Sequence, residues 1–201
     1  MNAAKHATTG VATGVVTAPL AAVTGLPGLV WVAVVVAGSI WPDGDHPQAS
    51  IARMWGPVSG AVVGVVSPLV GGHRGLTHHP ILGAVGAAVV LVVASLHPVT
   101  AAAGWAVLAG VFLAAAGSVI RRVPWLVNGA LSAGVGVLAY ATATPLAPAA
   151  PALALGVVVH LIGDRFRDNS RQARVAVAVS YLAVTAVVAC RLYPHLEGLT
   201  S

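Results

Sequence analysis

The chain has 201 residues, of which 58% are hydrophobic and only 7% are charged, and its mean hydropathy is +0.91. Soluble globular domains are about 45–50% apolar and about 25% charged, so this composition excludes an ordinary soluble domain. The net charge of +5 comes from basic residues scattered between apolar segments, a pattern typical of membrane proteins and not of nucleic-acid-binding surfaces. We therefore expect an all-α, polytopic transmembrane helical bundle that forms one integral membrane domain over residues 1–201.

The first apolar segments predict two spans. Residues 7–24 contain Gly10 and Gly14 one turn apart, which permits close helix packing, and we interpret this segment as a retained span and not as a cleaved signal peptide. Residues 29–40 form a second, short apolar run, which Pro42 ends.

Residues 57–72 are expected to form a re-entrant element. They are apolar, but they are short, interrupted by Pro68 and end in Gly71 and Gly72. Such irregular backbone is tolerated at membrane depth only where protein buries it. A full crossing would place His73 on the opposite side of the membrane from Asp43, whereas a re-entrant element keeps them on the same side.

The remaining apolar segments predict five further spans, which gives about seven spans in total. These spans are residues 81–96, 101–120, 124–140, 152–162 and 175–192. If the N-terminus is cytoplasmic, nine of the ten Lys and Arg residues fall on the cytoplasmic side of the membrane and only Arg191 falls on the other side. This agrees with the known bias of Lys and Arg toward cytoplasmic loops. The nine are Lys5, Arg53, Arg74, Arg121, Arg122, Arg165, Arg167, Arg171 and Arg174.

Three polar islands interrupt the apolar sequence at residues 41–48, 73–80 and 160–164, and the predicted topology brings them to one face. Burying imidazole and carboxylate groups is costly unless they have partners, and a metal ion can partner both. Since the only cysteine is Cys190, the ligands must be histidine and aspartate. The candidate ligands are His6, Asp43, Asp45, His73, His78, His160 and Asp164.

Spacing within the islands supports this interpretation. His160 and Asp164 are four residues apart, so they share one helix face, either as two ligands or as a pair that caps a helix end. Gly75 allows His73 and His78 to point at one centre. His79 would support the site or face substrate, and Thr77 is predicted to cap the following span.

Catalytic roles are predicted for Asp45 and Arg74. Asp43 and Asp45 flank a glycine and could each be a ligand or the general base, although an ordinary polar turn has the same composition. Arg74 would bind a phosphate-like anion, since guanidinium matches its oxygens, or it would be one more cytoplasmic cation. The role of His46 stays open, and His97 and His195 fall on the opposite face.

The islands resemble the motifs of the YdjM-like family of inner-membrane, metal-dependent putative hydrolases. The matching features are His6 before the first span, PDGDHP at residues 42–47, HRGLTH at residues 73–78 and HLIGD at residues 160–164. The resemblance extends over most of the chain. It implies an inner-membrane protein with a metal site, whereas it says little about the substrate.

We expect a membrane-embedded hydrolase with one or two divalent ions, zinc first and manganese second, at the cytoplasmic face. Its partners would be membrane lipids and an anionic small-molecule or lipid-linked phosphoester substrate, without nucleic acid; small-residue helix faces also permit a homo-oligomer. A metal or proton transporter is the first alternative, but the outer halves of the spans offer few polar groups. A non-enzymatic scaffold held together by metal is the second.

Overall fold

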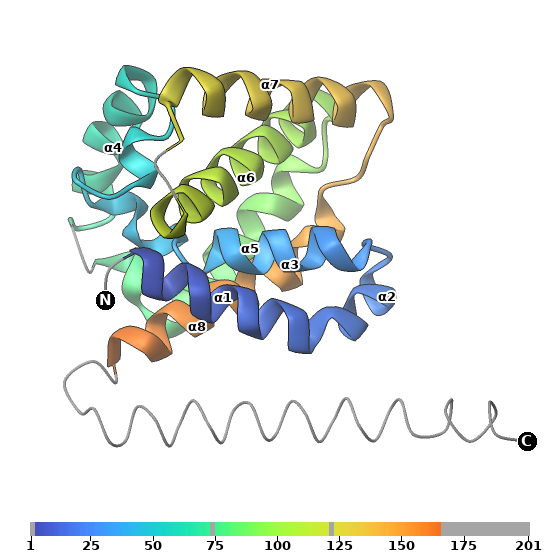
Figure 1. Ribbon diagram of the computed structural model, residues 1–201, viewed down its shortest axis with the longest axis horizontal. Coiled ribbons are helices and arrows are strands. Elements are labelled where there is room, and N and C mark those ends of the chain that lie inside the picture. Colours follow the sequence, from blue (N-terminus) through green and yellow to red (C-terminus); the bar gives the residue numbers. More distant parts are fainter. Residues whose placement is uncertain (1–2, 73–74, 121–122, 166–201) are drawn as a thin grey trace, which may run out of the picture.

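The computed structural model describes residues 3–72, 75–120 and 123–165. Within these ranges the chain is helical and contains no β-strand, which confirms the all-α prediction (Figure 1). The predicted last span, residues 175–192, lies outside the described residues, as do His73 and Arg74. The α-helices are α1 (Ala3–Thr17), α2 (Ala21–Thr24), α3 (Gly28–Gly38), α4 (Pro57–Leu69), α5 (Pro80–Ala94), α6 (Pro98–Val119), α7 (Trp125–Ala141) and α8 (Ala150–Arg165).

Three helical segments are long and apolar enough to cross a membrane: Ala3–Thr24, Pro98–Val119 and Ala147–Arg165. The first joins α1 and α2 through a short 3-10 turn, η1 (Ala18–Leu20). The other apolar helices in the described part are shorter, namely Gly28–Gly38, Pro57–Leu69, Ile81–Ala94 and Trp125–Ala141. These seven segments correspond to the predicted apolar runs before residue 165, although length alone does not make each of them a span.

Proline and histidine residues mark where the helices begin. Proline occupies the first turn of α4, α5 and α6, where its missing N–H is not needed. The ring nitrogens of His79 and His97 accept hydrogen bonds from the first turns of α5 and α6, at 3.3 Å and 3.2 Å. Thr77 was predicted to cap the helix that follows residues 73–80, which is α5. That prediction is wrong, because His79 occupies the N-cap position of α5.

The centre of the bundle is α3, which α1, α6 and α8 cover. Its consecutive residues Val34–Ala37 are all buried, so it is surrounded by protein and has no lipid-facing side over this stretch. Small residues make this possible, because a Cβ on Gly156 of α8 would lie 2.7 Å from the Cα of Gly38. The two helices therefore meet backbone to backbone, as small residues allow within a membrane.

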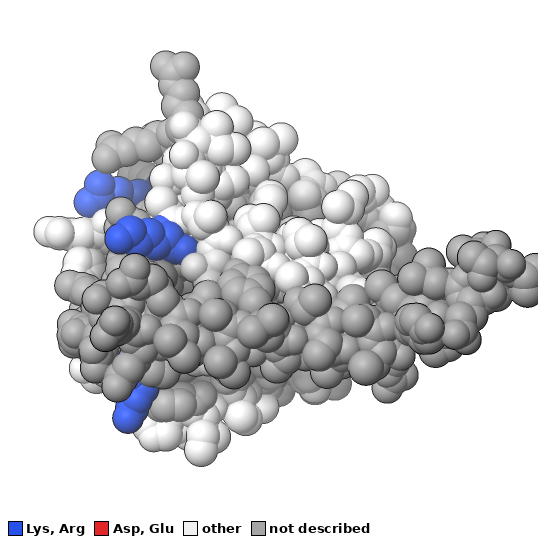
Figure 2. Space-filling view, turned by 60° about the horizontal axis from the view of Figure 1, so that its bottom comes forward, with Lys and Arg blue, Asp and Glu red and all other residues white. Residues whose placement is uncertain are grey.

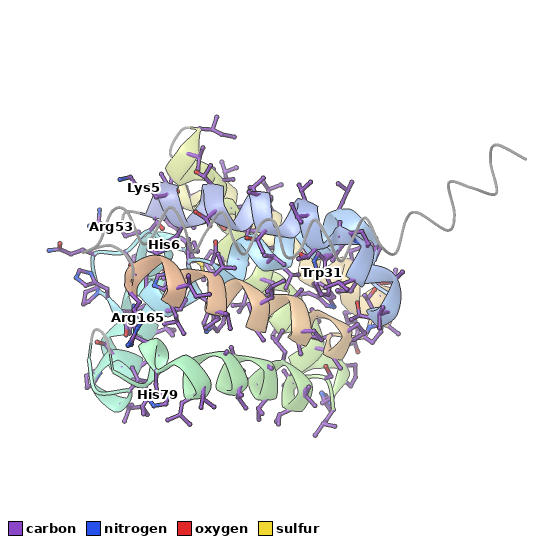
Figure 3. All side chains as sticks on the ribbon, turned by 90° about the horizontal axis from the view of Figure 1, so that it is seen from below. Lys5, His6, Trp31, Arg53, His79 and Arg165 are labelled. Carbon is purple, nitrogen blue, oxygen red and sulfur yellow. The ribbon has the colours of Figure 1, made fainter. Side chains whose placement is uncertain are left out.

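The polar islands lie at one end of the bundle. The first turn of α1, the end of α3, the start of α5 and the end of α8 meet there (Figure 1). In the described part of the chain, the cations are Lys5, Arg53 and Arg165, and all three lie at this same end (Figures 2 and 3).

The short helix α4 leaves this end and its chain returns to it. The island before α4 includes the 3-10 helix η2 (Trp41–Asp45), and the turn after α4 is the 3-10 helix η4 (Leu76–His78). Thr77 of η4 donates a hydrogen bond to Asp45 of η2. Both flanks of α4 therefore lie together, which is the arrangement expected of a re-entrant element.

Candidate metal centre

His160 is the most firmly fixed member of the cluster. It lies on the last turns of α8 with no exposed surface, and its Nδ1 atom is 2.8 Å from the carbonyl oxygen of Ser39 at the end of α3. A carbonyl oxygen can only accept, so Nδ1 must carry the proton and Nε2 has a lone pair. The close contact between Gly38 and Gly156 brings these two backbones into register for this bond.

His78 is held in the same way from the other side of the cluster. Its Nδ1 atom is 3.2 Å from the Thr77 hydroxyl oxygen and 3.5 Å from Oδ2 of Asp45. Because Thr77 donates its only hydroxyl proton to Asp45, its oxygen is left to accept from His78. Nδ1 therefore carries the proton, and the lone pair of His78 is also on Nε2.

The two lone pairs face each other, with 3.3 Å between the Nε2 atoms of His78 and His160. Asp43 Oδ1 is 3.6 Å from the His160 atom and 3.9 Å from the His78 atom. Asp164 Oδ2 is 3.6 Å and 3.8 Å from the same two atoms. Two nitrogen lone pairs and two carboxylate oxygens thus converge on one small volume.

His6 packs against the back of this group. Its ring stacks on His160 with 3.9 Å between centroids and an interplanar angle of 20°. Its Nε2 atom is 3.2 Å from Oδ1 of Asp164. Among the described residues, however, neither ring nitrogen of this buried side chain has a partner in hydrogen-bond geometry. A buried polar atom without a hydrogen bond is costly, so its presence here calls for a functional explanation.

The donor atoms fit one divalent cation. A tetrahedral ion with ligands at about 2.0–2.2 Å separates neighbouring ligand atoms by roughly 3.3–3.6 Å. The distances between the two nitrogens, and from each nitrogen to each oxygen, run from 3.3 to 3.9 Å, so the two histidines and either carboxylate match this spacing. Two overlapping groups of three residues each have their donor atoms within 4.8 Å of one another. The first is His6, His160 and Asp164, and the second is Asp43, His78 and His160. Nitrogen and carboxylate donors suit zinc or manganese.

The structure brings together six of the seven residues predicted as ligands, and the seventh, His73, lies outside the described residues, as does Arg74. The six do not have equal positions. Asp43, His78, His160 and Asp164 face the centre, whereas Asp45 lies on the Nδ1 side of His78 and His6 lies behind Asp164. Asp45 has no exposed side-chain surface, while Asp43 and Asp164 are 20% and 16% exposed.

Other polar residues take local roles that the sequence left open. The Nδ1 atom of His46 accepts a hydrogen bond from the backbone of Gln48 at 3.1 Å. Ser39 was not among the predicted site residues, because it contributes a backbone carbonyl and so leaves no side-chain signal. The bond between Thr77 and Asp45 was not predicted either, because that contact depends on the return of the chain after α4.

The fold and the site define a class of protein: an all-helical membrane protein with a buried His/Asp cluster at one end of its bundle. Within this class, the model of the YdjM inner membrane protein family matches residues 1–173. The chain therefore belongs to that family, which confirms the resemblance and the membrane localisation. Neither a curated protein nor a solved structure matches the chain.

Proposed function

We propose that this protein is a membrane-embedded, metal-dependent hydrolase. The observation that carries the proposal is the convergence of the His78 and His160 lone pairs with two carboxylates at a partly exposed bundle end. We assign His78, His160 and Asp164 as the ligands of one ion. Two histidines and one carboxylate with an open fourth position form a ligand set found in catalytic zinc sites.

Asp43 is the proposed general base. It faces both Nε2 atoms, at 3.6 Å and 3.9 Å, and it is the most exposed member of the cluster. Its carboxylate would accept the proton of the attacking water. When bound, a divalent cation would supply an activated water and stabilise negative charge that develops on the substrate.

Asp45 and His6 are positioning residues in this proposal. Metal-bound histidines normally donate their second N–H to a carboxylate or carbonyl oxygen, which fixes the ring. His78 has Thr77 and Asp45 on that side, and His160 has the Ser39 carbonyl. His6 would orient Asp164 through the oxygen that points away from the centre.

The proposed substrate is a phosphoester or a lipid-linked phosphoester. Lys5, Arg53 and Arg165 lie at the same end as the cluster, so an anionic group would be attracted there (Figure 3). Arg74 lies outside the described residues, and we propose for it the predicted role of binding the anion. We further propose that this end faces the cytoplasm, as the bias of Lys and Arg indicates.

A structural metal site is the second candidate function. Asp43 could be a fourth ligand, because its donor atom is within 4.8 Å of those of His78 and His160, and four protein ligands would close the site. A closed site would hold the ends of α3, α5 and α8 together without catalysis.

The test of hydrolysis uses protein purified in detergent and stripped with a chelator. We expect hydrolysis of bis(p-nitrophenyl) phosphate or of a phospholipid to return when Zn²⁺ or Mn²⁺ is added at about one equivalent per chain. A protein that binds one equivalent tightly and hydrolyses neither substrate with either ion would support the structural alternative.

A further inference from the structure

An apolar cleft lies beside the metal centre, on the Nδ1 side of His78. It has a volume of about 220 Å³ and is lined by residues of α4 and α6 together with Asp45 and Thr77. Its walls include two tryptophans, Trp41 and Trp55, and valines of both helices. The cleft is thus lined in part by the pair of residues that holds His78 in place.

The cleft also reaches the outer surface of α4. Val62 and Val66 line the cleft and are 56% and 38% exposed. The exposed surface continues over Val58, Val65 and Leu69, so the outer face of α4 is largely aliphatic. In an inner membrane protein, such a face contacts bilayer hydrocarbon, since burying it in lipid avoids exposing apolar surface to water.

Four polar side chains that line the cleft already have partners. Asp45 and Thr77 are bonded to each other, and the Ser59 hydroxyl oxygen accepts from the Trp55 backbone at 3.1 Å and donates to the Ala52 carbonyl. The indole N–H of Trp55 donates to Ser132 of α7 at 3.3 Å. The walls are thus fixed, and they present carbon surface to whatever occupies the cleft.

We propose that this cleft binds one hydrocarbon chain of a membrane lipid, with the polar end of that lipid beside Asp45 and Thr77, the residues that contact His78 of the metal centre. The inference rests on the proposed function in so far as the lipid is the substrate. The hydrocarbon chain would enter from the bilayer past Val62 and Val66, while the headgroup junction would lie near Asp45 and Thr77. On this basis α4 recognises the chain of the substrate.

The binding test does not depend on hydrolysis. The protein is reconstituted in vesicles with a phosphatidylglycerol that carries a diazirine near the end of one acyl chain, irradiated, and mapped by mass spectrometry. We expect label on Met54 and Trp55, which line the cleft. In Val66→Trp the indole would fill the mouth, and we expect this label to fall roughly tenfold.

Val65→Trp is the matched control. Val65 is 65% exposed on the same helix but does not line the cleft, so labelling of Met54 and Trp55 should stay unchanged. Val66→Phe provides a smaller blocking side chain should Val66→Trp fail to fold. Labelling of these two residues that is equal in both Val66 variants and the wild type would overturn the inference.

A parallel measurement separates this inference from the proposed hydrolase activity. If the protein is a lipid hydrolase, Val66→Trp should lower kcat/KM for a long-chain phospholipid by roughly tenfold and leave a water-soluble phosphodiester unaffected. Site-specific labelling without hydrolysis of any substrate would support the cleft and reject the hydrolase. Hydrolysis of both substrates with no dependence on Val66 would reject the cleft alone.

Discussion

The Nε2 atoms of His78 and His160 lie 3.3 Å apart, and each ring has its proton on the opposite nitrogen, facing an oxygen. Two lone pairs at this distance repel each other unless a positive charge lies between them. The sequence separates these residues by 82 positions, so the contact results from the fold and not from local geometry. We therefore regard this pair as the centre of the metal site.

Removing either histidine should abolish tight metal binding. His160→Ala or His78→Ala leaves two of the three proposed ligands, and we expect metal content to fall from about one equivalent to near zero after dialysis. His97→Ala is the control, because His97 caps α6 away from the cluster. The measurement is the metal content of the purified protein by mass spectrometry. If His160→Ala retained its full metal content, the assignment of His160 as a ligand would be contradicted.

Asparagine substitutions should distinguish the two carboxylates. Asp43→Asn removes the proposed base but no ligand, so we expect wild-type metal content and a loss of kcat of roughly 100-fold or more. Asp164→Asn weakens a ligand, so metal content itself should fall. If Asp43→Asn instead loses its metal, Asp43 is a ligand and the site is closed, as the structural alternative requires.

Thr77 should set metal affinity although it faces away from the metal centre. Thr77→Val removes the hydroxyl that bonds Asp45 and faces His78, and loss of such a supporting partner typically weakens metal binding roughly 10- to 100-fold. Thr77→Ser keeps the hydroxyl and should restore the affinity measured by competition with a chelating dye. Thr142→Val, which removes an exposed hydroxyl elsewhere, should leave the affinity unchanged.

The backbone contact between α3 and α8 should tolerate no side chain. In Gly156→Ala the new Cβ would press on Gly38 Cα and on the carbonyl oxygen of Val35, so we expect a loss of about 1–3 kcal/mol of stability and a lower Tm in detergent. Gly134→Ala in α7 meets no atom within 4 Å and should raise stability by about 0.5–1 kcal/mol. Equal Tm values for the two variants would refute this account of the contact.

The orientation in the membrane can be tested with single cysteines in a Cys190→Ala background. Gln48 is exposed at the end of the bundle that carries the cluster, and Thr142 is exposed after α7. With a cytoplasmic cluster, a membrane-impermeant maleimide added to intact cells should label Thr142→Cys only, and Gln48→Cys only after permeabilisation. The reverse pattern would place the site outside.

Much of this architecture could be predicted from the sequence. The apolar runs define the helices, and Pro42, Pro57 and Pro98 mark their ends or starts because proline lacks an N–H. The convergence of His6, Asp43, His78, His160 and Asp164 followed from alternating the spans and treating residues 57–72 as re-entrant. The large cost of burying ionisable groups among apolar helices makes such groups informative.

What could not be predicted are the roles within the cluster. Asp43 and Asp45 are equivalent in sequence, and only the direction of the short η2 turn separates the one that faces the centre from the one behind His78. Thr77 was expected to cap a helix, but its hydroxyl is drawn to Asp45 by a contact between segments 32 residues apart. Ser39 acts through its backbone, which every residue possesses.

The two halves of the cluster have different mechanical supports. His160 and Asp164 belong to α8, which packs backbone to backbone against α3, whereas Asp43 and His78 flank α4, whose outer valines are exposed. The short α4 has an exposed apolar face, whereas α8 packs against both α3 and α5, so we expect a thicker bilayer to shift Asp43 and His78 more than His160 and Asp164. We therefore expect the metal affinity of this protein to vary with the acyl-chain length of the surrounding membrane.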